Sequence, residues 1–266
     1  MLKIVVCVKA VPKPSIADKL KIDPVTKSLP RLDIPLVLNS LDGHALEAAL
    51  QLKKKYGAQV TVISMGPPPA GNIVRECLAL GADKGILLTD RAFAGADAYA
   101  TAFTLAKAIE KNGPVDVVFC GMASSDGATE WVGPEIAVFL DLPVVTMVRE
   151  ILEDLGEEWT VKADFEHGYR IVKLKLPAVL TVTRNLNRPK PLSFSGILKA
   201  RNKEITEWDC EALDLPAECV GLKGSPTYVT KMSSLESHRQ VEFLEGSMQE
   251  KVERFVQILS DAGVIP

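Results

Sequence analysis

The chain has 266 residues, of which 47% are hydrophobic and 24% are charged, and its formal net charge is -3. This composition is ordinary for a globular protein, and the absence of a long basic run argues against nucleic acid as a partner. No apolar run reaches the roughly 20 residues of a membrane-spanning helix, and the five cysteines show no CxxC spacing, so neither direct membrane insertion, nor a metal site, nor a disulfide framework is expected.

The first part of the chain shows strands alternating with helices. Residues 2–8 (LKIVVCV) form an apolar, β-branched run that is typical of a strand covered on both faces. Further strands are predicted at 59–64, 84–88 and 116–120, and helices at 40–56, 71–80, 96–112 and 131–140. This alternation predicts βαβ units and therefore an α/β fold with a doubly wound, mostly parallel sheet.

After about residue 145 the pattern changes to alternating polarity. Residues 147–155, 158–165 and 169–176 read as strands of an antiparallel β-meander, and 177–183 as a strand that returns to the parallel sheet. From about residue 187 the chain has few core residues, and a last helix is predicted at 249–262. We therefore expect an α/β domain over 1–205 and an extended C-terminal arm over 206–266 that becomes ordered on a partner.

Unusual residues gather after the predicted strands, where ligands of open parallel sheets bind. The first strand is followed by Lys9-Ala10-Val11-Pro12, and the strand at 84–88 by residues 89–97. The stretch 120–132 (CGMASSDGATEWV) combines small side chains with two glycines at the start of a helix. Its backbone amides and the helix dipole suit a phosphate or pyrophosphate.

Several polar residues near these loops have two interpretations. Asn39 either caps the helix that follows or hydrogen-bonds an adenine or ribose edge, and Asp126 either accepts from a ribose hydroxyl or caps its own turn. Asp97 is a candidate cap for the helix that follows. No Ser/His/Asp or Cys/His grouping and no GxxxxGK[ST] loop is present, so no catalytic side chain is expected.

The motifs resemble one family over essentially the whole chain. The matching segments are KIVVCVKAVPKP, LNSLDGHALEAALQLK, SMGPPP, CLALGADKGILL, GMASSDGATEWVGP and LKLPAVLTVTRNLNRPKPLSFSGILKARNKEI. In this order they resemble the beta subunit of electron transfer flavoprotein. The resemblance implies an adenine-nucleotide-binding, Rossmann-like fold whose C-terminal arm embraces an alpha subunit, in a heterodimer located in the cytoplasm.

The family has two branches with different cofactors. In one, this subunit holds structural AMP, and the dimer passes electrons from acyl-CoA dehydrogenases to a quinone reductase. In the other, a second FAD in this subunit takes a hydride from NADH and bifurcates its electrons, with ferredoxin, flavodoxin or a quinone as candidate acceptors. DRAFAGAD (90–97) and DGAT (126–129) resemble the bifurcating branch, as does Asp42. Ser40 and Glu130-Trp131 depart from the family pattern.

The resemblance also implies the site residues by position. Cofactor contacts would be Cys7, Ala10, Asn39, Ser40, Leu41, Asp42, Met65, Gly66, Phe93, Gly95, Asp97, Thr101, Gly121, Met122, Ala123, Ser124, Ser125, Asp126, Gly127, Ala128, Thr129, Glu130, Trp131 and Val132. Residues 190–200 resemble a recognition loop for the dehydrogenase partner, with Phe194, Ile197 and Leu198 as its contacts.

Two other classes remain as alternatives. A nucleotide sensor of the universal-stress type would share the βαβ units and a glycine-rich loop, but it needs neither the meander nor the arm. An adenylating enzyme of the ATP-pyrophosphatase type would carry a serine- and glycine-rich phosphate loop after the first strand, where this chain has Lys9-Ala10-Val11-Pro12.

Overall fold

The computed structural model describes residues 1–15, 34–230 and 241–265. The chain divides into two compact units, Met1–Thr230 and Lys231–Pro266. Within the described residues, no helix is both long enough and apolar enough to cross a bilayer.

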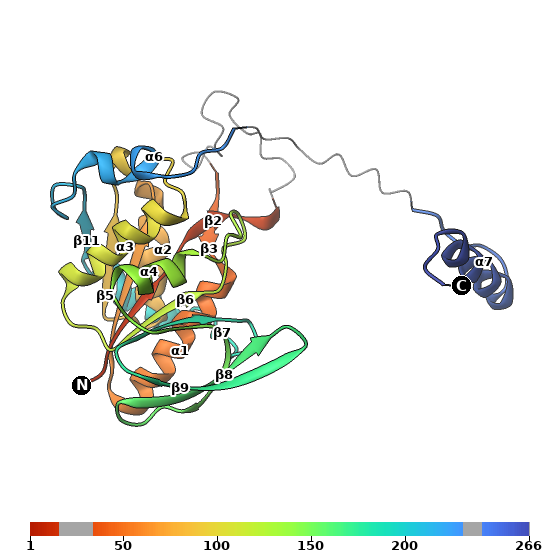
Figure 1. The fold of residues 1–266 in the computed structure, drawn as a ribbon, viewed down its shortest axis with the longest axis horizontal. Helices are drawn as coiled ribbons and strands as arrows, with labels where there is room; N and C mark the ends of the chain where they lie inside the picture. The colour runs from red at the N-terminus through yellow and green to blue at the C-terminus, as the bar shows by residue number, and fades with distance from the viewer. Residues whose placement is uncertain (16–33, 231–240, 266) are drawn as a thin grey trace. The chain divides into compact units, whose positions relative to one another are not determined.

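A nine-stranded sheet runs through the described part of the first unit (Figure 1). Its order is β11-β5-β4-β1-β6-β10-β7-β8-β9, and pairing is parallel from β11 to β7 and antiparallel from β7 to β9. The strands are β1 (Lys3–Cys7), β4 (Gln59–Met65), β5 (Lys84–Leu88), β6 (Val117–Gly121), β7 (Val144–Glu153), β8 (Glu158–Phe165), β9 (Gly168–Lys175), β10 (Ala178–Val182) and β11 (Ile205–Trp208). The predicted mostly parallel sheet with a meander is confirmed.

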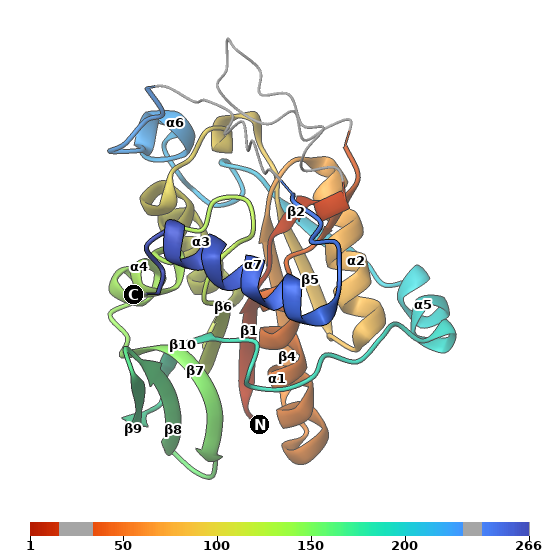
Figure 2. The same cartoon turned by 90° about the vertical axis from the view of Figure 1, so that its right-hand side faces the viewer.

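Helices cover both faces of the parallel strands (Figure 2). On one face lie α1 (Ser40–Tyr56) and α2 (Gly71–Leu80), and on the other α3 (Ala98–Asn112) and α4 (Val132–Phe139). Side chains of β1 alternate between the two cores: Ile4 and Val6 face α1 and α2, whereas Val5 and Cys7 face α3 and α4. This double burial explains why the strands read as continuous apolar runs.

The meander continues the sheet beyond its parallel part. β7 begins at Val144, three residues before the predicted start at 147, because its first residues pair in parallel with β10. Only its later residues pair with β8, so the alternating pattern begins late. Trp159 of β8 is 1% exposed and packs in the same core as α1.

Several regular elements were not predicted. β2 (Ala10–Pro12) pairs with β3 (Leu36–Leu38), and β11 adds an edge strand to β5. Helix α5 (Phe194–Arg201) replaces the predicted loop at 190–200. Short elements follow β11: η4 (Ala217–Cys219) and α6 (Gly221–Gly224). Of these, α6 contacts α3 and η3 (Arg91–Phe93). The sequence placed the arm at 206–266, yet residues 206–230 belong to the first compact unit.

The second unit contains the predicted last helix. α7 (Met248–Asp261) confirms the helix expected at 249–262, and it begins with a capping box between Ser247 and Glu250. The apolar side chains Val252, Phe255 and Val256 are about half exposed. Such a stripe is typical of a helix that packs against another surface.

Candidate functional site

The strand order reverses between β1 and β6. From β1 the chain continues to β4 on one side, and later to β6 on the other. The loops after two such strands diverge and leave a crevice at their carboxyl ends, where ligands of open α/β sheets bind. The loops at this point are residues 8–10 after β1 and 122–131 after β6, beside the start of α1.

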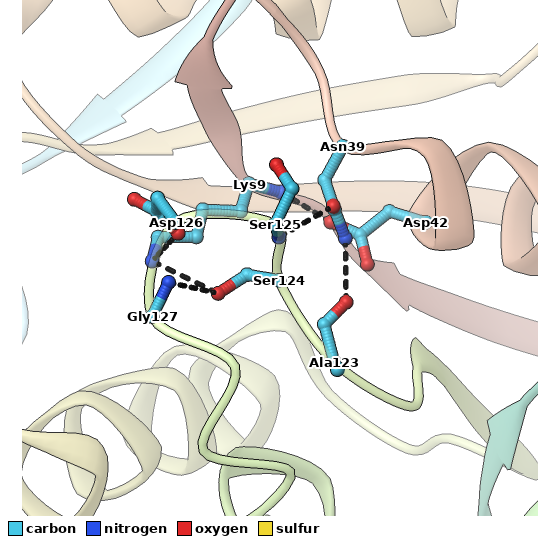
Figure 3. A network of polar contacts seen from close by, with 8 residues as sticks. All are labelled: Lys9, Asn39, Asp42, Ala123, Ser124, Ser125, Asp126 and Gly127. Atoms are coloured by element: carbon cyan, nitrogen blue, oxygen red, sulfur yellow. Dashed lines mark hydrogen bonds and ion pairs between the residues drawn. The ribbon is translucent and has the colours of Figure 1, made fainter. Parts of the chain in front are cut away.

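Asn39 connects the start of α1 to the loop after β6. Its Nδ2 donates to the carbonyl of Ala123 at 2.9 Å, and its Oδ1 accepts from the amide of Ser125 at 3.2 Å. The side chain is 2% exposed and makes no capping bond to α1. The capping interpretation is therefore wrong, and both ends of the amide hold the loop instead (Figure 3).

Asp42 joins the ends of β1 and β6 beneath the loop. Its Oδ2 accepts from the amide of Lys9 at 2.8 Å, and its Oδ1 accepts from the amide of Gly121 at 3.2 Å. Burial raises the pKa of this carboxyl to about 7, although the two amides oppose the rise. A Cβ on Gly121 would lie 2.3 Å from Asp42 Oδ1, so the contact depends on glycine.

Lys9 reaches the far side of the same loop. Its Nζ lies 2.7 Å from Oδ1 of Asp126 and 3.3 Å from Oγ of Ser124 (Figure 3). Ser124 Oγ also accepts from the amide of Gly127 at 3.3 Å. The Asp126 side chain is only 5% exposed, so Lys9 supplies a positive charge to a nearly buried carboxylate.

The remainder of the loop is open to solvent. Residues 127–131 are exposed, and Ala128 and Glu130 have left-handed backbone conformations with φ of 47° and 63°. Trp131 is 63% exposed and directly precedes α4. An exposed loop with left-handed backbone next to a lysine is suited to an anionic ligand such as a phosphate.

Other predicted contacts surround this crevice. Cys7 is buried and pairs in register with Cys120 on β6, and the hydrogen bond to Cys7 together with burial raises the pKa of the Cys120 thiol. Met65 ends β4 and is half-buried, and Gly66 donates to the carbonyl of Leu88. The others are Ala10 in β2, Ser40 and Leu41 in the first turn of α1, Met122 and Thr129 in the loop, Thr101 in the first turn of α3, and Val132 at the start of α4.

The loop after β5, residues 89–97, is partly covered, and Arg91, Ala94 and Gly95 are exposed. Phe93 is 5% exposed and packs in the core that also contains α3. Gly95 has φ of 75°, and a Cβ there would lie 3.1 Å from Leu222 Cβ. Asp97 caps α3 as predicted, and its Oδ2 accepts from the amide and the hydroxyl of Thr227.

The predicted partner contacts lie on one exposed helix. In α5, Phe194 is 77%, Ile197 49% and Leu198 52% exposed. Arg75 of α2 holds the C-terminal end of α5, because its Nη1 donates to the carbonyls of Ala200 and Lys203 at 2.8 and 2.9 Å. α5 is therefore a fixed apolar surface rather than a loop.

Sequence reasoning missed two contributors to the site. Lys9 follows the first strand but is not among the cofactor contacts that the resemblance implies. Its position two residues after the end of β1 could have indicated a role in the site. The segment 217–227, which covers the loop after β5, carried no recognisable motif.

Two further features bear on where a ligand could bind. No group of three metal-ligating side chains exists among the described residues. A hollow of about 450 Å³ lies away from the crevice, beside the first residues of β5 and the end of α3, and includes Lys84, Lys111 and Trp208 in its lining. It is not at the strand reversal, so we prefer the crevice on topological grounds.

Comparisons with known proteins identify the family. The model of the electron transfer flavoprotein domain matches residues 30–213. The electron transfer flavoprotein subunit beta of Thermoanaerobacterium thermosaccharolyticum is 45% identical over 99% of this chain and 100% of its own length. That of Clostridium acetobutylicum is 44% identical over 98% of both chains. CarD, a subunit of the caffeyl-CoA reductase–Etf complex of Acetobacterium woodii, is 42% identical over 94% of this chain and 95% of its own.

These matches cover nearly the whole chain and agree with the fold. They exclude the nucleotide-sensor and adenylating-enzyme alternatives, and the beta-subunit identity of the relatives implies an alpha-subunit partner. The chain belongs to the beta-subunit family of electron transfer flavoproteins.

Proposed function

We propose that this chain holds the adenosine diphosphate part of an FAD in the crevice between β1 and β6. With its alpha subunit, it would receive a hydride from NADH and divide the two electrons between two acceptors. The observation that carries the nucleotide site is the loop after β6, which Lys9 and Asn39 hold beside Asp42 while its outer residues 127–131 are exposed.

The residues present fit such a group. Nucleotide phosphates need cations and backbone amides, and the crevice offers Lys9 beside the exposed stretch 127–131. Gly127 lies close to this cation, since a Cβ there would be at ordinary contact distances of 3.4 Å from Ser124 Oγ and 3.7 Å from Lys9 Nζ. A bound flavin supplies the hydride and electron chemistry, and the protein's role is to position it and to control access.

The sequence of two loops supports the bifurcating branch. Residues 90–97 and 126–129 carry the segments that resemble it. In the first of them, Asp90 caps η3 and Asp97 caps α3. Similarity to CarD, whose name places it in a caffeyl-CoA reductase–Etf complex, supports a partner that acts on an acyl-CoA thioester.

One observation favours the alternative with structural AMP. A nicotinamide would need access near Phe93 and Gly95, and α6 covers this loop through the hydrogen bond from the amide of Leu222 to the carbonyl of Ala94. Hydride transfer at the buried Phe93 would therefore require residues 217–227 to move, whereas Gly95 is exposed as it stands. An AMP-binding carrier that serves acyl-CoA dehydrogenases and a quinone reductase requires no such movement.

A second part of the proposal concerns the dehydrogenase and the electron acceptors that the heterodimer would contact. The exposed apolar residues of α5 are suited to a dehydrogenase surface, because an exposed aromatic on a rigid element is a frequent interface hot spot. Ferredoxin, flavodoxin or a quinone reductase would receive the electrons, and the complex would operate in the cytoplasm.

The test is the cofactor content of the heterodimer after co-expression with the alpha subunit. Two FAD per dimer, no AMP and rapid bleaching by NADH are the expected results. One FAD and one AMP, with no response to NADH, would establish the alternative. The variant Asn39→Ala should lose the nucleotide of this subunit, whereas the control Asn112→Ala, at the end of α3, should retain it.

A further inference from the structure

Lys9 stands out because its backbone is fixed while its side chain bridges to another element. Its amide donates to Asp42 and its carbonyl accepts from the amide of Asn39 at 3.0 Å, so the main chain is held at the end of β1. The side chain then extends to Ser124 and Asp126 in the loop after β6. One lysine thus joins the end of β1 to the loop after β6.

The ion pair is asymmetric. The Lys9 side chain is 35% exposed, whereas that of Asp126 is 5% exposed. A nearly buried carboxylate needs compensating partners, and the Lys9 ammonium is one of them. The exposed ammonium can still reach a ligand at the mouth of the crevice.

We propose that Lys9 is the cation that contacts the nucleotide phosphate, and that its ion pair with Asp126 is a latch that the phosphate opens. The proposal rests on the nucleotide site proposed above. The amide of Gly127 shares Ser124 Oγ with Lys9 Nζ, so the cation lies next to the backbone that would bind the same phosphate. Phosphate and Asp126 then compete for one ammonium group.

Competition for the Lys9 ammonium and a purely structural ion pair predict different effects of mutation on phosphate binding. Removing the lysine should weaken phosphate binding, because a charge-assisted contact is lost. Removing the charge of Asp126 should strengthen it, because the competitor and a repulsive charge disappear together. A structural pair would weaken binding when either partner is changed.

The experiment titrates AMP and adenosine into the nucleotide-free heterodimer of the full-length chain, at low and high salt. For Lys9→Met we expect AMP affinity to fall roughly tenfold to hundredfold, with little change for adenosine and a weaker salt dependence. For Asp126→Asn we expect AMP to bind several-fold more tightly and adenosine to bind unchanged.

The surface pair Lys107–Glu110 on α3 provides matched controls, since it has the same 2.7 Å separation. Lys107→Met and Glu110→Gln change the net charge equally and should leave both affinities unaltered. The latch is overturned if Asp126→Asn weakens AMP binding, or if Lys9→Met affects adenosine as much as AMP. A wild-type heterodimer that binds neither AMP nor FAD in this subunit would instead overturn the proposed function and the latch with it.

If Lys9→Met does not assemble with the alpha subunit, Asp126→Asn alone tests the proposal, through whether AMP binds more tightly or more weakly than to wild type. Lys9→Arg gives a second measurement, because it keeps the charge and should retain most of the preference for AMP over adenosine. Loss of that preference in the arginine variant would contradict a role based on charge.

Discussion

The loops after β6 and β5 are held by different parts of the chain, although the family resemblance assigns both to one cofactor. The loop after β6 is fixed from below by Asn39 and Asp42, and its outer residues 127–131 are exposed. The loop after β5 is fixed from above, where residues 221–227 contact Ala94 and Asp97. The outer part of the first loop is open to solvent, whereas the second is partly covered by residues 221–227.

Each of the two loops depends on one closely packed glycine. Gly121 allows a strand end to lie against α1, and Gly221 allows the cover to lie against the loop after β5. In both places a single Cβ would meet polar oxygen or backbone. We therefore expect a substitution of Gly121 to disturb the loop after β6 alone, and a substitution of Gly221 to disturb the loop after β5 alone.

The largest effect is expected for Gly121→Ala. The added Cβ would lie 2.3 Å from Asp42 Oδ1 and 2.8 Å from the Leu41 carbonyl carbon, so the floor of the crevice must shift. We expect the free energy of unfolding to fall by about 3 kcal/mol in denaturant titrations. Gly127→Ala in the same loop, whose nearest contact would be 3.4 Å, should cost less than about 1 kcal/mol. Equal losses would show that Gly121 has no special constraint.

Gly221→Ala should have the next largest effect and should open the other loop. Its φ is 57°, and a Cβ would clash with the carbonyl of Ala92. We expect a loss of about 2 kcal/mol and faster amide hydrogen exchange in residues 91–95. The control Gly156→Ala has a comparable φ of 75° but nothing within 4 Å of the new Cβ, so it should show only the conformational cost of about 1 kcal/mol. Unchanged exchange in 91–95 would mean that α6 does not cover the loop.

The variant Asp42→Asn tests the contacts of Asp42 with the amides of Lys9 and Gly121, through the pH dependence of stability. An asparagine has one acceptor oxygen for two amides, so one buried N–H loses its partner at a cost of about 1–3 kcal/mol. Because burial raises the Asp42 pKa from 3.8 to about 7, the folded protein holds a proton that the unfolded chain has released. The stability that wild type has relative to Asp42→Asn should therefore decrease as pH rises from about 4 to about 7. A difference that grows with pH over this range would contradict the raised pKa.

The smallest effect is expected for Thr227→Val. The change removes the hydroxyl that donates to Asp97 Oδ2 at 2.7 Å, while the Thr227 amide remains bonded to the same oxygen. Thermal unfolding should report a loss of about 1 kcal/mol, with unchanged nucleotide content. If the heterodimer loses its nucleotide in this subunit, the two loops are not independent and the comparison fails.

Much of the parallel sheet and its helices could be predicted from local patterns. The strands around β1 are buried on both faces, so they appear as continuous apolar runs, and Asp97 and Gly57 mark helix ends through capping that depends only on neighbouring residues. β11 escaped prediction because an edge strand of four residues with two exposed side chains carries little periodic signal. β2 and β3 are shorter still.

The site was predicted in outline but not in its connections. The loop at 121–132 could be recognised from its small residues, but the bonds of Asn39 to Ala123 and Ser125 join segments more than 80 residues apart and leave no local trace. Capping was the natural local interpretation of Asn39, and tertiary hydrogen bonds displaced it. The cover over Phe93 is equally non-local, since residues 221–227 follow it by more than 120 positions.

The central claim is that the nucleotide of this subunit lies at the carboxyl ends of β1 and β6. Photo-crosslinking of the nucleotide-free heterodimer with 8-azido-AMP, followed by peptide mapping, tests this location directly. We expect labelled peptides from 39–46 and 121–132, and protection by unlabelled AMP. Labelling confined to 83–88 and 203–208, beside the hollow that contains Lys84 and Trp208, would place the nucleotide elsewhere and contradict the account.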